Sequence, residues 1–308
     1  KRLKERPDGE PLILLVPEQA TFQAERELVA TPGLAGIIRA QALSFRRLAW
    51  RIMQETGGIA RVPINDSGKQ MLIHKIFHEY REQLRIFPYS ADQTGFLKQV
   101  CDLFNEWKRY RVSGERLKRF FAENAGVFAQ HSAKLKDKLH DLLFVYERFE
   151  DELSRSYLDG EECLDILAAQ LKNSSYLRHA EIWVDGFYGF TPQEYAVLEQ
   201  MCIHCRHVTV TLCLDREYHP GDRLHELELF HPTARTMIAL QELADKAGVE
   251  KKPVVRLGDD VLPRFQESPM LAALESLLSR QREKPEDDGR LLPSAISVYE
   301  AASRRAEV

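Results

Sequence analysis

The sequence predicts an α/β fold in which a parallel sheet is interrupted by a large helical segment. Short, fully apolar runs at 12–16 and 181–184 have the length and composition of buried parallel strands. Helical patterns follow both runs, and strands that alternate with helices are typical of a parallel sheet. From residue 66 to about 171 the pattern is helical and carries no strand signal, which indicates an inserted helical subdomain.

The first part of the sheet is expected within residues 1–65. Leu12 to Val16 is bounded by Pro11 and Pro17, and Gly57-Gly58 ends the unit. The elements expected between these limits are a helix over 19–29, a weaker strand over 36–43 and a helix from 44 to about 55.

The helical segment is expected over 66–179. Asp66 or Ser67 can cap its first helix. The helix expected over 94–110 gathers its apolar residues, Trp107 among them, on one side, which indicates a core position for that indole. Further helices are expected over 133–153 and 161–171.

The sheet is expected to resume over 180–292. Glu181 to Val184 ends at Asp185, and Thr191 to Glu194 form a capping box with proline at the first helical position. Further strands are expected over 208–214, 254–256 and 295–300, and a charged linker over 282–290. A new lobe would begin at about 293, so that residues 293–308 form its truncated start.

Composition restricts the class of protein. The 308 residues are 44% hydrophobic and 29% charged, with a net charge of −4, which is ordinary for a globular chain but does not indicate nucleic-acid binding by itself. We find no apolar run long enough for a membrane helix and no signal peptide. Five cysteines fit a reducing compartment, so we expect a cytoplasmic protein. Both ends read as interrupted helices, so we expect a piece of a longer chain.

The segment 28–54 is the strongest candidate for binding. It carries four arginines and no acidic residue. On a helix over 45–54, one face is apolar, and Trp50 lies near the centre of the other. Bases stack on aromatic rings and phosphates pair with arginine, so this face suits single-stranded nucleic acid. Packing of Trp50 against another domain remains an alternative. The polar face consists of Arg46, Arg47, Trp50, Arg51 and Gln54.

Other motifs are weaker. Asp185 ends a strand as a Walker-B aspartate does, but Gly186 stands where a second carboxylate would orient water, and a GxxxxGK[ST] loop is absent from the 308 residues. A plain strand-end aspartate is the alternative. Cys202 and Cys205 form a CxxC without a second ligand pair, so we expect no metal site. The basic stretch 108–119 could follow a phosphate backbone or be a solvated face.

Several stretches together resemble the AddB family of helicase–nuclease proteins. They cover the chain, and the block around Asp185 is the most specific of them: LVPEQATFQAEREL (15–28), GLAGIIRAQALSFRRLAWRIMQETGG (33–58), KLHDLLFVYERFEDEL (138–153), WVDGFYGFTPQEYAVLEQ (183–200), HELELF (225–230) and EAASRRAEV (300–308).

The resemblance implies a RecA-like, superfamily 1 helicase fold with a helical insertion. It implies a role in double-strand break repair, in which AddA is the motor while AddB guides one DNA strand and contributes to Chi recognition. The family also carries a phosphate-binding loop, which would precede Lys1, and a 4Fe-4S nuclease domain. We therefore expect no ATP, magnesium or cluster to be held by this stretch alone, and no catalytic residue. The DNA-contacting positions that the resemblance implies are Gln19, Thr21, Phe45, Arg47, Trp50, Phe187 and Phe190.

Three hypotheses follow from these patterns. The first is a module that holds single-stranded DNA within a helicase–nuclease. The second is an ATP-binding motor lobe, against which the missing phosphate loop counts. The third is a scaffold that grips AddA, because residues 147–165 hold eight acidic groups against two arginines and would suit a protein partner better than DNA.

Overall fold

The structure is a computed structural model, and it describes residues 2–5, 8–33, 39–57, 61–124, 133–257, 268, 270–272, 274–275 and 300–303. The linker expected over 282–290 lies outside the described residues. So does nearly all of the lobe expected to begin at 293.

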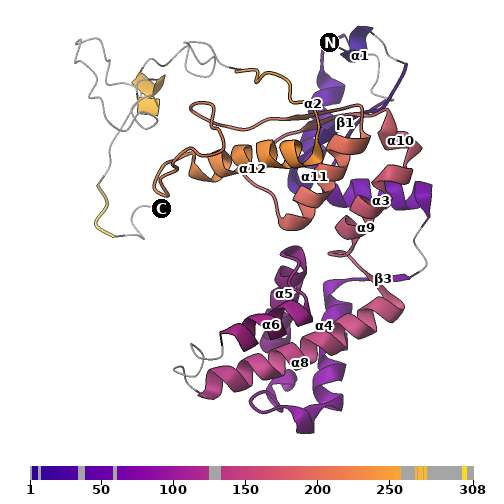
Figure 1. The fold of residues 1–308 in the computed structure, drawn as a ribbon, viewed down its shortest axis with the longest axis vertical. Coiled ribbons are helices and arrows are strands. Elements are labelled where there is room, and N and C mark those ends of the chain that lie inside the picture. The colour runs from indigo at the N-terminus through magenta and orange to yellow at the C-terminus, as the bar shows by residue number, and fades with distance from the viewer. Residues whose placement is uncertain are drawn as a thin grey trace.

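A four-stranded parallel sheet forms the centre of the upper lobe in Figure 1. Its strands are β1 (Leu12–Leu15), β2 (Ala40–Leu43), β5 (Glu181–Val184) and β6 (His207–Val210), in the order β2-β1-β5-β6. All three pairings are parallel, which confirms the expected α/β class. Ile13 and Leu15 of the inner strand β1 are fully buried, as its apolar composition requires.

Helices follow the strands and cover the sheet. Helix α2 (Thr21–Ala30) follows β1 after a short 3-10 turn, and α3 (Phe45–Thr56) follows β2. The Ser44 side chain caps α3 by accepting from the Arg47 amide, and the Thr191–Glu194 capping box begins α11 (Pro192–His204), as the sequence predicts. Helix α12 (His231–Ala247), which was not among the expected helices, packs against α11. The apolar face of α3 is buried as expected, through Phe45, Leu48, Ala49, Ile52 and Met53.

A separate helical lobe lies below the sheet lobe in Figure 1. It is built from α4 (Asp66–Glu79), α5 (Thr94–Arg109), α6 (Gly114–Glu123) and α8 (Ala133–Ser156), and it has its own hydrophobic core. Trp107 packs against that core, with its ring centroid 5.0 Å from that of Tyr146. The prediction that this indole is a core residue is confirmed.

Residues 163–178 pack with the sheet rather than with the helical lobe. Helices α9 (Cys163–Gln170) and α10 (Ser175–Arg178) contribute to the hydrophobic core of the sheet lobe, and α9 lies against α3 and α11. The sequence pattern places these residues in the helical segment, because helical periodicity alone does not say which core a helix joins.

A two-stranded parallel sheet joins the lobes. Strand β3 (Val62–Ile64) pairs with β4 (Tyr157–Asp159), where the chain leaves the sheet lobe and returns to it. The sequence does not reveal this pair, because both strands are three residues long and Pro63 argues against a strand.

Two strand expectations are wrong in extent. The strand expected over 208–214 ends at Val210, and residues 254–256 form no strand. Within the described residues, none of the helices combines the length and the apolar character needed to cross a membrane.

Candidate nucleic-acid interface

The loops that leave the carboxyl ends of the sheet carry most of the sequence-predicted site. Because the four strands are parallel, these ends share one edge of the sheet, where open α/β sheets bind their ligands. Gln19 and Thr21 follow β1, Phe45 and Arg47 follow β2, and the 185–190 loop follows β5. The sheet thus brings three separate sequence motifs to one edge.

A polar link joins the first two of these loops. The Ser44 hydroxyl donates to the Glu18 carboxylate, and the Arg47 guanidinium lies 3.5 Å from the same carboxylate. About half of each side chain in the Arg47–Glu18 pair is exposed. An exposed ion pair of this kind is weak, so the guanidinium can exchange this partner for a phosphate.

An aromatic cluster packs between the carboxyl-end loops and the core of the sheet lobe, and it consists of Phe45, Phe187 and Phe190. The Phe45 ring centroid lies 5.6 Å from that of Phe187 and 6.3 Å from that of Phe190, and the latter two lie 5.1 Å apart. Phe45 is only 5% exposed, and the other two rings are half-buried against the sheet core. Phe45 therefore supports the loop after β5 instead of presenting its ring to solvent.

Trp50 lies one helical turn beyond Arg47 on α3. Its indole is half-buried and packs against the sheet core. The neighbouring arginines point in different directions: Arg51 lies 4.1 Å from the centroid of the Tyr176 ring, and Arg46 lies close to Gly160. The four polar residues expected on this face of α3 are exposed, but Trp50 at its centre packs against the core, which differs from the expectation. Arg47 contacts the carboxyl-end loop after β1 through Glu18.

Gln19 and Thr21 differ in exposure. Gln19 is exposed in the 3-10 turn after β1, whereas Thr21 is buried and its hydroxyl donates to the Glu18 carbonyl over 2.9 Å. The Gln19 amide can therefore reach a ligand directly, and Thr21 shapes the turn that presents it.

Asp185 is exposed at the end of β5, where its carboxylate accepts from the Thr211 hydroxyl. The next residue, Gly186, has φ +79°, and an added Cβ there would lie 3.3 Å from the ring of Pro17. A magnesium–nucleotide site needs a phosphate-cradling loop and a further carboxylate beside the strand-end aspartate. Here Gly186 follows Asp185, and the 308 residues contain no GxxxxGK[ST] sequence, so the described residues around Asp185 do not by themselves fit a nucleotide.

The two most exposed aromatic residues at this edge are not among the residues expected from the sequence. Phe22, at the start of α2, is 75% exposed, and Tyr188, in the loop after β5, is 76% exposed. They follow β1 and β5, which are neighbours in the sheet. The sequence shows glycines at 186 and 189 beside these rings, but no local pattern says which ring faces outward.

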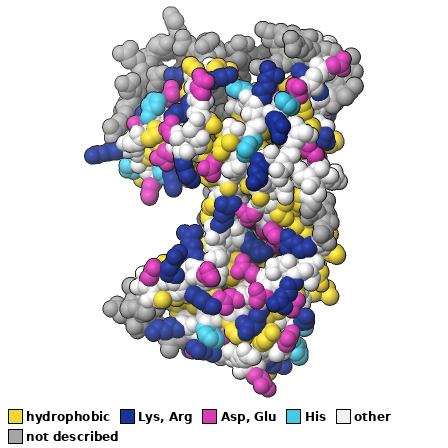
Figure 2. All heavy atoms as spheres, turned by 45° about the vertical axis from the view of Figure 1, so that its right-hand side comes forward, with side chains coloured by type: hydrophobic (Ala, Val, Ile, Leu, Met, Phe, Trp, Pro, Cys, Tyr) yellow, Lys and Arg dark blue, Asp and Glu magenta, His cyan; other side chains and the backbone are white. Residues whose placement is uncertain are grey.

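The charged stretches at 108–119 and 147–165 pair largely with each other. Lys108 contacts Asp159, Arg109 makes a two-point contact with Glu161, Arg111 contacts Asp165, and Lys118 contacts Glu147. Figure 2 shows positive and negative side chains intermixed over both lobes on one face of the molecule. Neither stretch presents a surface of a single sign, for DNA or for a protein partner.

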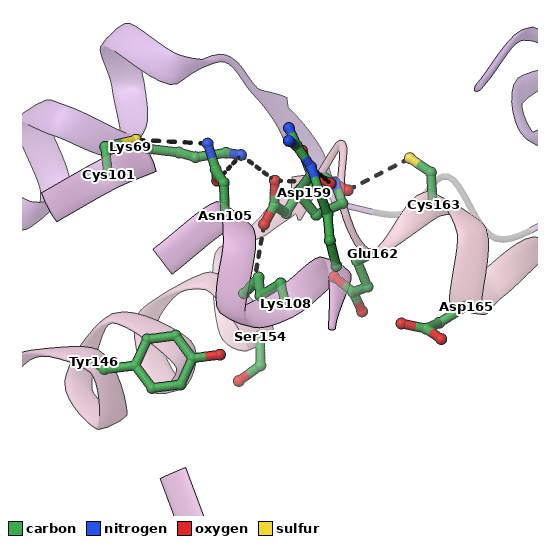
Figure 3. Close-up of polar contacts among 12 residues, drawn as sticks. Lys69, Cys101, Asn105, Lys108, Tyr146, Ser154, Asp159, Glu162, Cys163 and Asp165 are labelled. Atoms are coloured by element: carbon green, nitrogen blue, oxygen red, sulfur yellow. Dashed lines mark hydrogen bonds and ion pairs between the residues drawn. The ribbon is translucent and has the colours of Figure 1, made fainter. Parts of the chain in front are cut away.

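The centre of this charge network is Asp159, at the end of β4, and Figure 3 shows Lys69 and Lys108 converging on its carboxylate. Its carboxylate is fully buried, 2.6 Å from Lys69 Nζ and 3.0 Å from Lys108 Nζ, and Asn105 accepts from Lys69 over 2.8 Å. Burial opposes ionisation, but Lys108 and Lys69 hold the pKa of Asp159 below its ordinary value. Since α4 and α5 supply the lysines and β4 supplies the aspartate, this cluster fixes the helical lobe to the two-stranded β3–β4 sheet that joins the lobes.

The CxxC pair lies at the end of α11. Burial raises the pKa of Cys205 to about 12 and also raises the pKa of Cys202, so both thiols are protonated. Thiolates are the form that binds metals. In the described part of the chain, we find no group of three or more His, Cys, Asp or Glu side chains arranged to hold a metal ion.

Comparison with known proteins decides the family. The family described as "ADDB, N-terminal" matches residues 1–275. The chain belongs to the AddB family. It is 46% identical to a Desulforudis audaxviator protein, 42% to one from Geobacillus kaustophilus and 37% to one from Bacillus subtilis, each named as a subunit of an ATP-dependent helicase/deoxyribonuclease. The matches cover 99–100% of this chain and 26% of each relative, so the chain spans about a quarter of the length of these AddB proteins.

Proposed function

We propose that this chain is a RecA-like lobe, with a helical insertion, that holds single-stranded DNA for an AddAB-type helicase–nuclease acting in double-strand break repair. It would guide one strand along the carboxyl edge of its sheet, contribute to Chi recognition there, and work together with an AddA partner. The names of the relatives support the complex, and the four parallel strands support the RecA-like reading.

One observation carries the proposal. The parallel sheet places an exposed arginine, an exposed amide and aromatic rings from three distant motifs along a single edge. Arginine neutralises phosphates, and aromatic rings stack on unpaired bases. The opposing motor hypothesis lacks a comparable observation, because Asp185 pairs with Thr211 and no phosphate-binding loop accompanies it.

The test is binding of a fluorescent single-stranded oligonucleotide, measured by anisotropy. The double change Arg47→Ala and Trp50→Ala should weaken binding, because each stacked base is worth about 1–3 kcal/mol and each phosphate contact adds to the salt dependence. The matched control is Arg81→Ala with Tyr89→Ala, an arginine–aromatic pair in the helical lobe whose centroid distance is 4.8 Å. Equal affinity of the double variant and wild type would refute the proposal.

A turnover assay separates the motor hypothesis from this one. Because the residues around Asp185 do not fit a nucleotide, the 308-residue chain should hydrolyse no ATP above background with magnesium and DNA present. The scaffold hypothesis predicts AddA binding without salt-dependent DNA binding. The acidic stretch on which that hypothesis depended is largely paired within the chain.

A further inference from the structure

We infer that Tyr188, together with Phe22 after the neighbouring strand, is a base-stacking platform for an unpaired strand at the carboxyl edge of the sheet. This inference rests on the proposed function and adds to the aromatic residues expected from the sequence two rings that are more exposed than any of them. The aromatic residues expected from the sequence are less exposed. Phe45 is buried, while Phe187, Phe190 and Trp50 are half-buried against the core.

The loop that carries Tyr188 is held at both ends. On one side the Asp185 amide donates to the Leu15 carbonyl over 2.9 Å, and Gly186 lies against Pro17. On the other side the Thr191 amide donates to the Glu194 carboxylate over 2.7 Å, within the capping box of α11. The loop is therefore short and anchored.

The middle of the loop is held as well. The Thr236 hydroxyl, from α12, donates to the Tyr188 carbonyl over 2.9 Å. Phe187 and Phe190, on either side, pack into the aromatic cluster with Phe45. At Gly189 an added Cβ would come within 3.3 Å of the Thr236 hydroxyl, so a small residue is needed for this approach.

An exposed ring on such an anchored loop differs from an ordinary surface tyrosine. The 76% exposed ring of Tyr188 has no aromatic, cationic or hydrogen-bonding partner within the described part of the chain. Its backbone is already ordered, so a base that stacks on it incurs little of the entropy cost of ordering a loop. Tyrosine also has few rotatable bonds for its contact area.

Phe22 supplies a second ring at the same edge. It is 75% exposed at the first turn of α2, directly after the buried Thr21. Its strand, β1, pairs with β5, whose loop carries Tyr188, and Arg47 contacts Glu18 in the turn between β1 and α2. Two exposed rings and one exposed guanidinium, in segments that follow three neighbouring strands, match the chemistry of a single DNA strand, since bases stack and phosphates pair with arginine.

The experiment measures anisotropy of a labelled 12-nucleotide single strand and of the matching duplex. Tyr188→Ala should weaken single-strand binding roughly fivefold or more, and Phe22→Ala should also weaken it. Tyr188→Phe should bind like wild type, because the stacking face is kept. Tyr89→Ala is the matched control, since that ring is 70% exposed in the helical lobe. Duplex binding should not respond to Tyr188→Ala, because paired bases offer no free face.

Salt titration separates the platform from the phosphate contact. Arg47→Ala should reduce the slope of log affinity against log salt by about 1, whereas Tyr188→Ala should leave that slope unchanged. If Tyr188→Ala binds like wild type while Arg47→Ala is weakened, the platform is refuted and the proposed function stands. If the wild-type chain does not bind the single strand, both are refuted. An equal loss in Tyr89→Ala would also overturn the inference.

Discussion

Replacing Asp159 with asparagine should loosen the joint between the two lobes. The substitution keeps the size of the side chain but removes the fully buried carboxylate that faces both Lys69 and Lys108. Lys69 is only 3% exposed, so its ammonium group cannot recover solvation by a small movement. Two cations would then share one buried space with no anion between them.

The size of the effect follows from these burials. Breaking a buried ion pair by removing one partner costs about 3–5 kcal/mol. Lys69 keeps Asn105 at 2.8 Å and the exposed Asp66 at 3.6 Å, and Lys108 is partly exposed. These remaining partners place the expected loss of unfolding free energy near the lower limit, about 3 kcal/mol. Lys69→Met should cost less, because Asp159 would still pair with Lys108.

Urea unfolding followed by circular dichroism measures this loss. The control is Asp92→Asn, which breaks an exposed pair with Arg81 at 3.4 Å and should cost less than about 1 kcal/mol. If Asp159→Asn destabilises the chain no more than Asp92→Asn does, the buried cluster does not stabilise the joint and the reasoning fails.

Four further outcomes are expected. The pKa of Asp159 is lowered in the folded chain, so the stability that its carboxylate contributes is present above the ordinary aspartate pKa of about 3.9 and is lost as pH falls below that value. The difference in unfolding free energy between wild type and Asp159→Asn, measured by urea titration, should therefore shrink below this pH. A difference that stays constant with pH would contradict this. Gly186→Ala should cost about 1–2 kcal/mol for its positive φ plus the Pro17 contact. The loss should exceed that of Gly248→Ala, which has φ +66° and open space; equal losses would remove the role of the contact. Asp141→Ala should lower the unfolding free energy by roughly 1.5–3 kcal/mol, because the buried Asp141 carboxylate accepts from the three consecutive amides of residues 85–87 at 2.7–3.1 Å. Urea unfolding measures this loss, and no loss would show that the 85–87 turn is stable without the carboxylate. Phe45→Ala should lower the unfolding free energy by about 3–5 kcal/mol and weaken DNA binding, because Phe45 supports the 185–190 loop through Phe187. Unchanged DNA affinity in the folded variant would show that the aromatic cluster does not affect binding.

Local patterns in the sequence determined much of the fold. The strands at Leu12 and Glu181, the capping box at Thr191 and the buried face of α3 follow from apolar runs and periodicity, and they were predicted correctly. The β3–β4 pair could not be predicted, because both strands are three residues long, one contains Pro63, and neither shows a periodic pattern. They are stabilised by pairing with each other and, for β4, by contacts with α8.

The site was only partly accessible from the sequence. A helical wheel placed Arg46, Arg47 and Arg51 on one face, but it could not show that Arg51 reaches Tyr176 while Arg47 reaches Glu18, since both partners come from distant segments. Which ring of the 187–190 loop faces outward depends on the glycines and on Thr236, a contact across 48 residues. Tertiary contacts therefore decided exposure, and exposure decides which rings can meet a base.

Amide hydrogen exchange with and without a single-stranded oligonucleotide tests the central claim most directly, because it reports where the strand lies. The account predicts slower exchange on DNA addition in three segments only: the turn at 18–22, the start of α3 at 45–50 and the loop at 185–190. Protection confined to the helical lobe, or none at these carboxyl-end loops while the oligonucleotide is bound, would contradict it.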